Sequence, residues 1–76
     1  MLQLLRICWR VIGLTGKPIV CGIYIDDRPG VELRVGYTLG DILKAQRMSD
    51  ADTAQHVAEQ WRLTTLANGF AELPNP

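Results

Sequence analysis

His56 is the only histidine of the chain, and helical spacing would bring two carboxylates beside it. Asp52 lies four residues before it and Glu59 three residues after it, so the three side chains would share one helix face. Such a face could ligate a divalent metal. Neighbours at these spacings are, however, common on any charged helix, and this face lies opposite the apolar stripe of the same segment. We therefore expect a solvated helix face here and no metal site.

The two cysteines, Cys8 and Cys21, are the other residues with reactive side chains. They are too few for a disulfide scaffold, and two free thiols suit a reducing compartment, which predicts a cytoplasmic protein. In the strands predicted below, Cys21 has the parity of the inward-facing side chains and Cys8 that of the outward-facing ones. We expect the thiols on opposite faces of the sheet, where they cannot form a disulfide without movement of the backbone.

The sequence does not supply the set of residues that nucleophilic catalysis requires. Ser49 is the only serine, and its place before a predicted helix is explained by capping. Asp26 and Asp27 are adjacent, and turn initiation explains them. The chain has no glycine-rich phosphate loop and no paired metal-thiolate spacing. We expect a non-enzymatic protein without catalytic residues, cofactor or metal.

The length and the net charge of the chain limit the number of domains, the extent of burial and the kinds of partner that we expect. The 76 residues predict a single domain over 1–76, and a chain this short buries only about 60% of its unfolded surface. Self-association often stabilises such domains. The formal net charge is zero, so no global field attracts the chain to nucleic acid or to anionic lipid. Arg6 and Arg10 interrupt the apolar N-terminus, and no run approaches the roughly 20 apolar residues of a membrane span.

Three stretches in the N-terminal half carry their apolar side chains at odd positions, which is typical of strands with one buried face. They predict strands at about 3–13, 18–26 and 31–37, although the arginine spacing of the first would also suit an amphipathic helix. The residues that share the inward parity are Ile7, Trp9, Val11, Ile19, Cys21, Ile23, Ile25, Val31, Leu33, Val35 and Tyr37.

Two turn signals set the expected register. A three-residue loop at 15–17 contains Gly16, and the segment 26–30 begins with Asp and ends with Pro-Gly. Both registers keep odd positions opposite odd positions, as a sheet with one buried face requires. The expected pairs are Ile7–Ile25, Trp9–Ile23 and Val11–Cys21 in the first hairpin, and Ile23–Leu33, Cys21–Val35 and Ile25–Val31 in the second.

The C-terminal half predicts a helix at about 50–68. Ser49 or Asp50 can cap its start, and Asn68-Gly69 supplies a stop. Its apolar stripe has Trp61 in the middle, which we expect to fill the space between helix and sheet. The segment 38–48 fits either a short helix or a fourth strand at 42–48, and we favour the strand. The predicted fold is α+β: an antiparallel meander of three or four strands (ββββα or βββα), covered on one face by a single C-terminal helix.

The remaining candidate for function is a surface. Leu4, Ile12 and Val20 have the outward parity of the sheet, and several exposed apolar residues on a small domain indicate an interface. We expect a protein partner or, more specifically, a homodimer. The alternative is an accessory nucleic-acid-binding protein that uses the basic outer face of the sheet. That face would offer only one aromatic side chain on which a base could stack. The candidate surface comprises Arg6, Cys8, Arg10, Tyr24, Arg34, Leu63 and Leu66.

Overall fold

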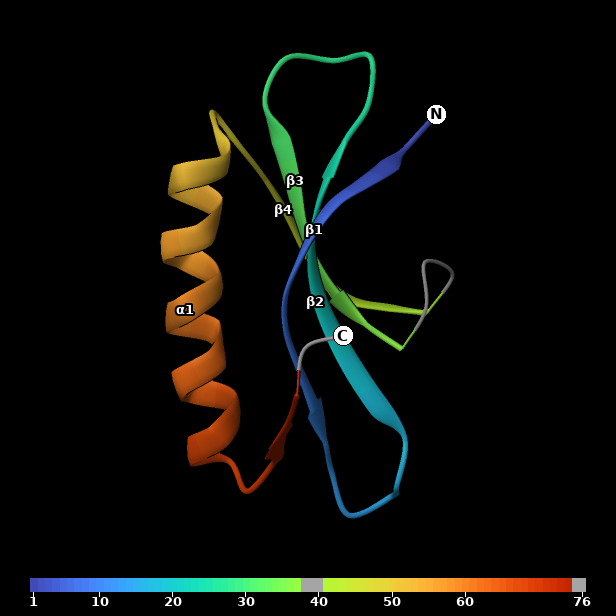
Figure 1. The fold of residues 1–76 in the computed structure, drawn as a ribbon, viewed down its shortest axis with the longest axis vertical. Coiled ribbons are helices and arrows are strands. Elements are labelled where there is room, and N and C mark those ends of the chain that lie inside the picture. Colours follow the sequence, from blue (N-terminus) through green and yellow to red (C-terminus); the bar gives the residue numbers. More distant parts are fainter. Residues whose placement is uncertain (38–40, 75–76) are drawn as a thin grey trace.

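The computed structural model describes residues 1–37 and 41–74 and contains two layers, an antiparallel sheet and one helix packed on it (Figure 1). The strands lie in the order β4-β3-β2-β1-β5. This confirms the predicted α+β class and the preference for a fourth strand, while 38–40 lies outside the described residues. The elements are β1 (Gln3–Ile12), β2 (Pro18–Ile25), β3 (Val31–Gly36), β4 (Ile42–Met48), α1 (Ala51–Ala67) and β5 (Ala71–Leu73).

The hairpin of β2 and β3 has the predicted register, in which Ile23 pairs with Leu33. The Asp26 side chain accepts the backbone N–H of Arg28 at 3.0 Å, which stabilises the start of the turn. Gly30 ends it with φ +85°, a left-handed conformation that favours glycine. Turn chemistry and apolar parity agree here, and for that reason the sequence predicted this hairpin correctly.

The predicted register of β1 with β2 is wrong. Trp9 pairs with Cys21, and the hairpin closes at Ile12 opposite Pro18, so that the connection is longer than the expected three-residue loop. The backbone N–H of Gly16 donates to the carbonyl of Gly13 at 3.1 Å inside this connection. The turn therefore begins earlier than expected.

Two irregularities in β1 then change which way its side chains point. They lie between Leu4 and Arg6 and between Ile7 and Trp9. A bulge adds one residue to one strand, so the odd–even alternation shifts at each one. Trp9 and Val11 face the helix as predicted, but Ile7 pairs with Gly22 and points away from it.

The core lies between the sheet and α1, with Trp9 at its centre. Its indole is 2% exposed, and its Nε1–H donates to the backbone carbonyl of Ala58 at 2.7 Å. Ala54 and Ala58 are fully buried, so their small side chains let the helix approach the indole closely. The expectation that Trp61 fills the middle is wrong: it is half-buried at the border of the core, where the Lys44 Nζ lies 4.2 Å from its ring centroid.

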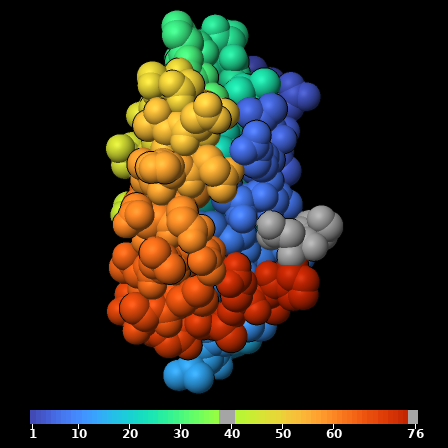
Figure 2. Space-filling view, turned by 60° about the vertical axis from the view of Figure 1, so that its left-hand side comes forward, coloured from blue at the N-terminus to red at the C-terminus, as the bar shows by residue number. Residues whose placement is uncertain are grey.

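The helix begins and ends where the sequence predicts. Asp50 is the N-cap, and its carboxylate accepts the backbone N–H of Thr53 at 2.8 Å. Gly69 follows the helix with φ +94° and reverses the chain. The reversal leads into β5, an unpredicted strand that pairs with Arg10–Ile12 of β1 and appears in red in Figure 2. No helix in the described part of the chain combines the length and apolar character that a membrane crossing requires.

Candidate functional site

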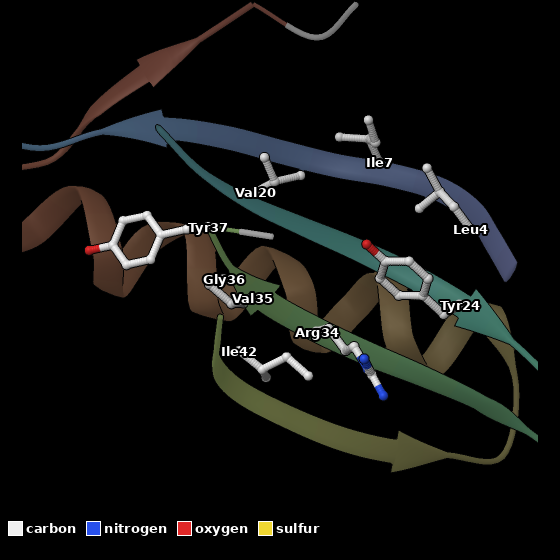
Figure 3. A pocket seen from close by; sticks show the side chains of 9 residues that line it. All are labelled: Leu4, Ile7, Val20, Tyr24, Arg34, Val35, Gly36, Tyr37 and Ile42. Atoms are coloured by element: carbon white, nitrogen blue, oxygen red, sulfur yellow. The ribbon is translucent and has the colours of Figure 1, made fainter. Parts of the chain in front are cut away.

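Helix α1 covers one face of the sheet, and the opposite face carries a group of apolar side chains (Figure 3). When only one face of an antiparallel sheet is covered, the other face ordinarily carries polar side chains. Here the central strands instead bring aliphatic and aromatic side chains together around a shallow depression of about 180 Å³. We refer to this group as the open-face patch; it comprises Leu4, Ile7, Val20, Tyr24, Tyr37 and Ile42.

The patch is accessible to solvent over much of its area. Leu4 is 47% exposed, Tyr37 38% and Ile42 40%. Gly22 forms part of the floor, since a Cβ built there would lie 3.1 Å from both the Leu4 Cδ1 and the Tyr24 Cε1 atoms. The absence of a side chain at this position lets the leucine and the tyrosine approach each other, which keeps the patch continuous across β1 and β2.

The charged side chains beside the patch are paired with one another. Arg47 contacts the Asp26 carboxylate at 2.7 Å, and Arg28 contacts it at 2.9 Å. The hydrogen bond from Arg28 lowers the pKa of Asp26 to about 2. Arg34 pairs with Glu32, and its guanidinium carbon lies 5.8 Å from the Tyr24 ring centroid.

Tyr24 is the aromatic residue of the patch that lies beside these ion pairs. Burial raises the pKa of its phenol, and the Arg34 charge acts in the opposite direction. The phenol therefore stays neutral at physiological pH. Together with the ion pairs around it, it makes a surface on which positive and negative groups largely cancel locally.

The sequence placed Arg6 and Cys8 on this outer face, and that placement is wrong. Both side chains point toward the helix, where the Arg6 guanidinium donates to the Gln55 Oε1 at 3.1 Å and the Cys8 Sγ lies 3.8 Å from the same oxygen. The bulge between Ile7 and Trp9 explains the reversal. The basic outer face on which the nucleic-acid-binding alternative depends consequently does not include Arg6.

Of the remaining candidates, Tyr24 and Arg34 lie at the open face as expected. Arg10 donates to the Pro74 carbonyl at 3.2 Å near the β5 edge. Leu63 is 51% exposed on α1, while Leu66 packs against the core. The seven candidates therefore do not form one surface, because α1 lies on the other side of the sheet.

Half of the open-face patch can be found from the sequence. Leu4, Val20 and Tyr24 have the outward parity that predicts this face, whereas Tyr37 has the inward parity, and its expected place on the buried face is wrong. Ile7 was assigned to the core because nothing in a single sequence marks the bulge beside it. Ile42 reaches the patch through a register irregularity between β3 and β4, at Gly36, where the chain passes so closely that a Cβ would lie 2.5 Å from the Asp41 carbonyl oxygen.

The potential metal ligands on α1 are engaged in other ways or exposed. His56 is exposed, and Glu59 pairs with Arg62 at 2.7 Å. This ion pair lowers the pKa of Glu59. Among the described residues, no three His, Cys, Asp or Glu side chains are grouped so that they could hold a metal ion.

The two thiols lie on the same face of the sheet, contrary to the expectation. Cys21 is fully buried in the core, and Cys8 is half-buried against it. The Cys21 thiol donates a hydrogen bond to Cys8 and thereby lowers the pKa of Cys8, to which the charge of Arg6 also contributes. The same bond, together with burial, raises the pKa of Cys21. Cys8 is therefore the more acidic thiol of the pair.

Comparison with protein-family models, with curated proteins and with solved structures found no match to this chain. Inferences about its function therefore depend on the geometry of its own surfaces.

Proposed function

We propose that this chain is a small non-enzymatic interaction module that forms a homodimer through the open face of its sheet. The observation that carries the proposal is the open-face patch, a continuous apolar area on the sheet face that α1 leaves uncovered. Contiguous apolar patches of this kind on small proteins commonly mark interfaces.

Charge favours a second copy as the occupant. The chain has zero formal net charge, and Asp26, Glu32, Arg34 and Arg47 beside the patch are already paired within one molecule. A strongly charged partner would meet carboxylates and guanidinium groups that are mostly paired already, and Lys17 over the Tyr37 ring adds one positive charge at the edge. A second copy presents the same largely compensated surface, and two-fold symmetry makes one patch its own complement.

The molecular dimensions set the largest interface that this face could form. The molecule measures 36 × 23 × 21 Å, so one whole broad face is on the order of the 800 Å² that each partner contributes to a standard-size interface, and a dimer of that size would use nearly all of it. Dimerisation would place a second layer on the uncovered face, giving the sheet a core on both sides. The dimer would bury additional apolar surface, and a chain of 76 residues buries only a limited fraction of its surface when it folds alone.

We further propose a cytoplasmic location. Both cysteines are reduced thiols in mutual contact, an arrangement that persists where the compartment is reducing.

Sedimentation equilibrium over a range of concentrations tests the proposed dimer. Two leucines provide a matched pair: Leu4 in the patch is 47% exposed and Leu63 on α1 is 51% exposed. Burial of a leucine contributes roughly 1.5–3 kcal/mol, so Leu4→Glu should raise the dimer Kd at least about tenfold. Leu63→Glu should leave the Kd unchanged.

Circular dichroism of both variants controls for folding. A wild-type protein that remains monomeric at millimolar concentration would contradict the proposal. A dimer that Leu63→Glu disrupts and Leu4→Glu does not would also contradict it, because the interface would then lie on the helix.

A further inference from the structure

We infer that Cys8 and Cys21 are a redox-responsive pair that closes to a reversible disulfide between β1 and β2. This inference is independent of the proposed dimer, since both thiols lie on the helix side of the sheet and the open-face patch lies on the other.

The bulge in β1 brings the two thiols together. Cys8 is the extra residue between the paired positions Ile7–Gly22 and Trp9–Cys21. In a bulge two residues of one strand oppose a single residue of its partner, and the extra side chain is re-aimed. Cys8 and Trp9 therefore both lie opposite Cys21, on the face that α1 covers.

The contacts of Cys8 agree with this placement. Its Sγ lies 3.8 Å from the Oε1 of Gln55, a residue of α1, and its side chain packs against the core that contains Cys21. Neighbouring strands are about 4.8 Å apart, which is within the Cα separation that a disulfide spans. Both cysteines can therefore meet without separating the strands.

The two thiols differ in accessibility and in pKa, so Cys8 is the one that reacts first with an external oxidant. Cys8 is half-buried on a part of β1 that β5 does not pair with, since β5 reaches only Arg10–Ile12. Figure 2 shows this N-terminal half of β1, in blue, at the molecular surface. Cys21 is fully buried and cannot reach an external reagent. Its hydrogen bond and the nearby Arg6 lower the pKa of Cys8, which increases the thiolate fraction of the accessible residue.

Hydrogen peroxide is the oxidant that we consider. The Cys8 thiolate attacks one peroxide oxygen and breaks the O–O bond, which gives a sulfenic acid and hydroxide; the hydroxide takes up the proton that the thiol had lost. The Cys21 sulfur then attacks the Cys8 sulfur, forms the S–S bond, and its proton leaves with the sulfenic oxygen as water. Two thiols and one peroxide thus give one disulfide and two waters.

The test uses the reduced full-length chain under native conditions, at low protein concentration, with hydrogen peroxide added. We expect both free thiols to be lost, the intact mass to decrease by two hydrogens, and a peptide containing Cys8 to be linked to one containing Cys21. Closing this loop of about 14 residues should also raise the melting temperature by roughly 12–24 °C.

Two variants serve as controls. Cys21→Ala keeps a small apolar side chain in the core, and its Cys8 should stop at a sulfenic acid that dimedone traps, with no rise in melting temperature. The double variant Ile7→Cys/Cys8→Ser moves the thiol to the neighbouring residue, which faces away from Cys21, and should not form the link.

Three results would overturn the inference. In the first, Cys8 of the wild type proceeds to sulfinic acid while Cys21 remains a free thiol. In the second, the only disulfide formed joins two copies. In the third, the pair reacts in urea but not in the folded protein.

Discussion

Replacing Trp9 with phenylalanine tests whether this indole, rather than that of Trp61, joins the two layers. Trp9 is 2% exposed and donates its Nε1–H to the Ala58 carbonyl at 2.7 Å, whereas Trp61 is half-buried at the border of the core. The same substitution at both positions removes the same atoms from two different environments. A comparison of Trp9→Phe with Trp61→Phe therefore isolates the effect of position.

The expected magnitudes follow from these environments. Loss of the buried hydrogen bond costs about 1 kcal/mol, and the space left by the missing ring adds roughly 1–2 kcal/mol. Trp9→Phe should therefore lower the free energy of unfolding by about 2–3 kcal/mol, a large part of the roughly 3–5 kcal/mol expected for a domain of this size. Trp61→Phe weakens a partly exposed contact with Lys44 and should cost below about 1 kcal/mol.

Urea unfolding, followed by far-UV circular dichroism, measures both losses. Acrylamide quenching gives a second readout on the same variants, since Trp61→Phe retains the buried indole and should be quenched less than Trp9→Phe. Equal losses of stability in the two variants, or a loss below about 1 kcal/mol for Trp9→Phe, would refute the described core.

Two further predictions concern the turn between β2 and β3. Gly30→Ala should destabilise the protein by at least about 1 kcal/mol, because Gly30 has φ +85° and an added Cβ would meet the carbonyl oxygen of Met48. Gly16→Ala is the control and should cost less, because Gly16 has φ +79° but nothing lies within 4 Å of an added Cβ. Equal urea midpoints for the two variants would contradict this prediction. The Asp26 pKa of about 2, which the hydrogen bond from Arg28 lowers, is below the unfolded value of about 3.9. Its stabilisation is therefore complete above roughly pH 5 and is lost as the pH falls from about 4 through 2. Asp26→Asn should flatten the urea midpoint over this range, and an unchanged pH profile would disprove the assignment.

The sequence predicts most of the fold because several signals coincide in its middle and C-terminal parts. The turn at 26–30 and the parity of the flanking strands select the same register, and Asp50 and Gly69 mark the ends of the helix. The short strand β5 was not predicted, because three residues carry too little periodicity and their pairing depends on where the reversal after Gly69 directs the chain.

The candidate site was predicted less well, and β1 explains most of the difference. Its bulges shift the parity twice, so that Arg6 and Cys8 turn toward the helix and Ile7 turns outward. No glycine or proline inside β1 marks either bulge. The prediction for Trp61 is wrong for a related reason. A hydrophobic stripe shows which face of a helix is buried, but it does not show which indole occupies the space beneath that face.

An isotope-filtered NOE experiment on a mixture of labelled and unlabelled copies identifies the side chains that meet across the proposed dimer interface. If the open-face patch is the dimer interface, intermolecular NOEs are expected between the Leu4 and Val20 methyl groups of one copy and the Tyr24 and Tyr37 rings of the other. Intermolecular NOEs that involve Leu63 on α1 instead, or a dimeric sample without intermolecular NOEs at the open-face patch, would contradict the proposed interface.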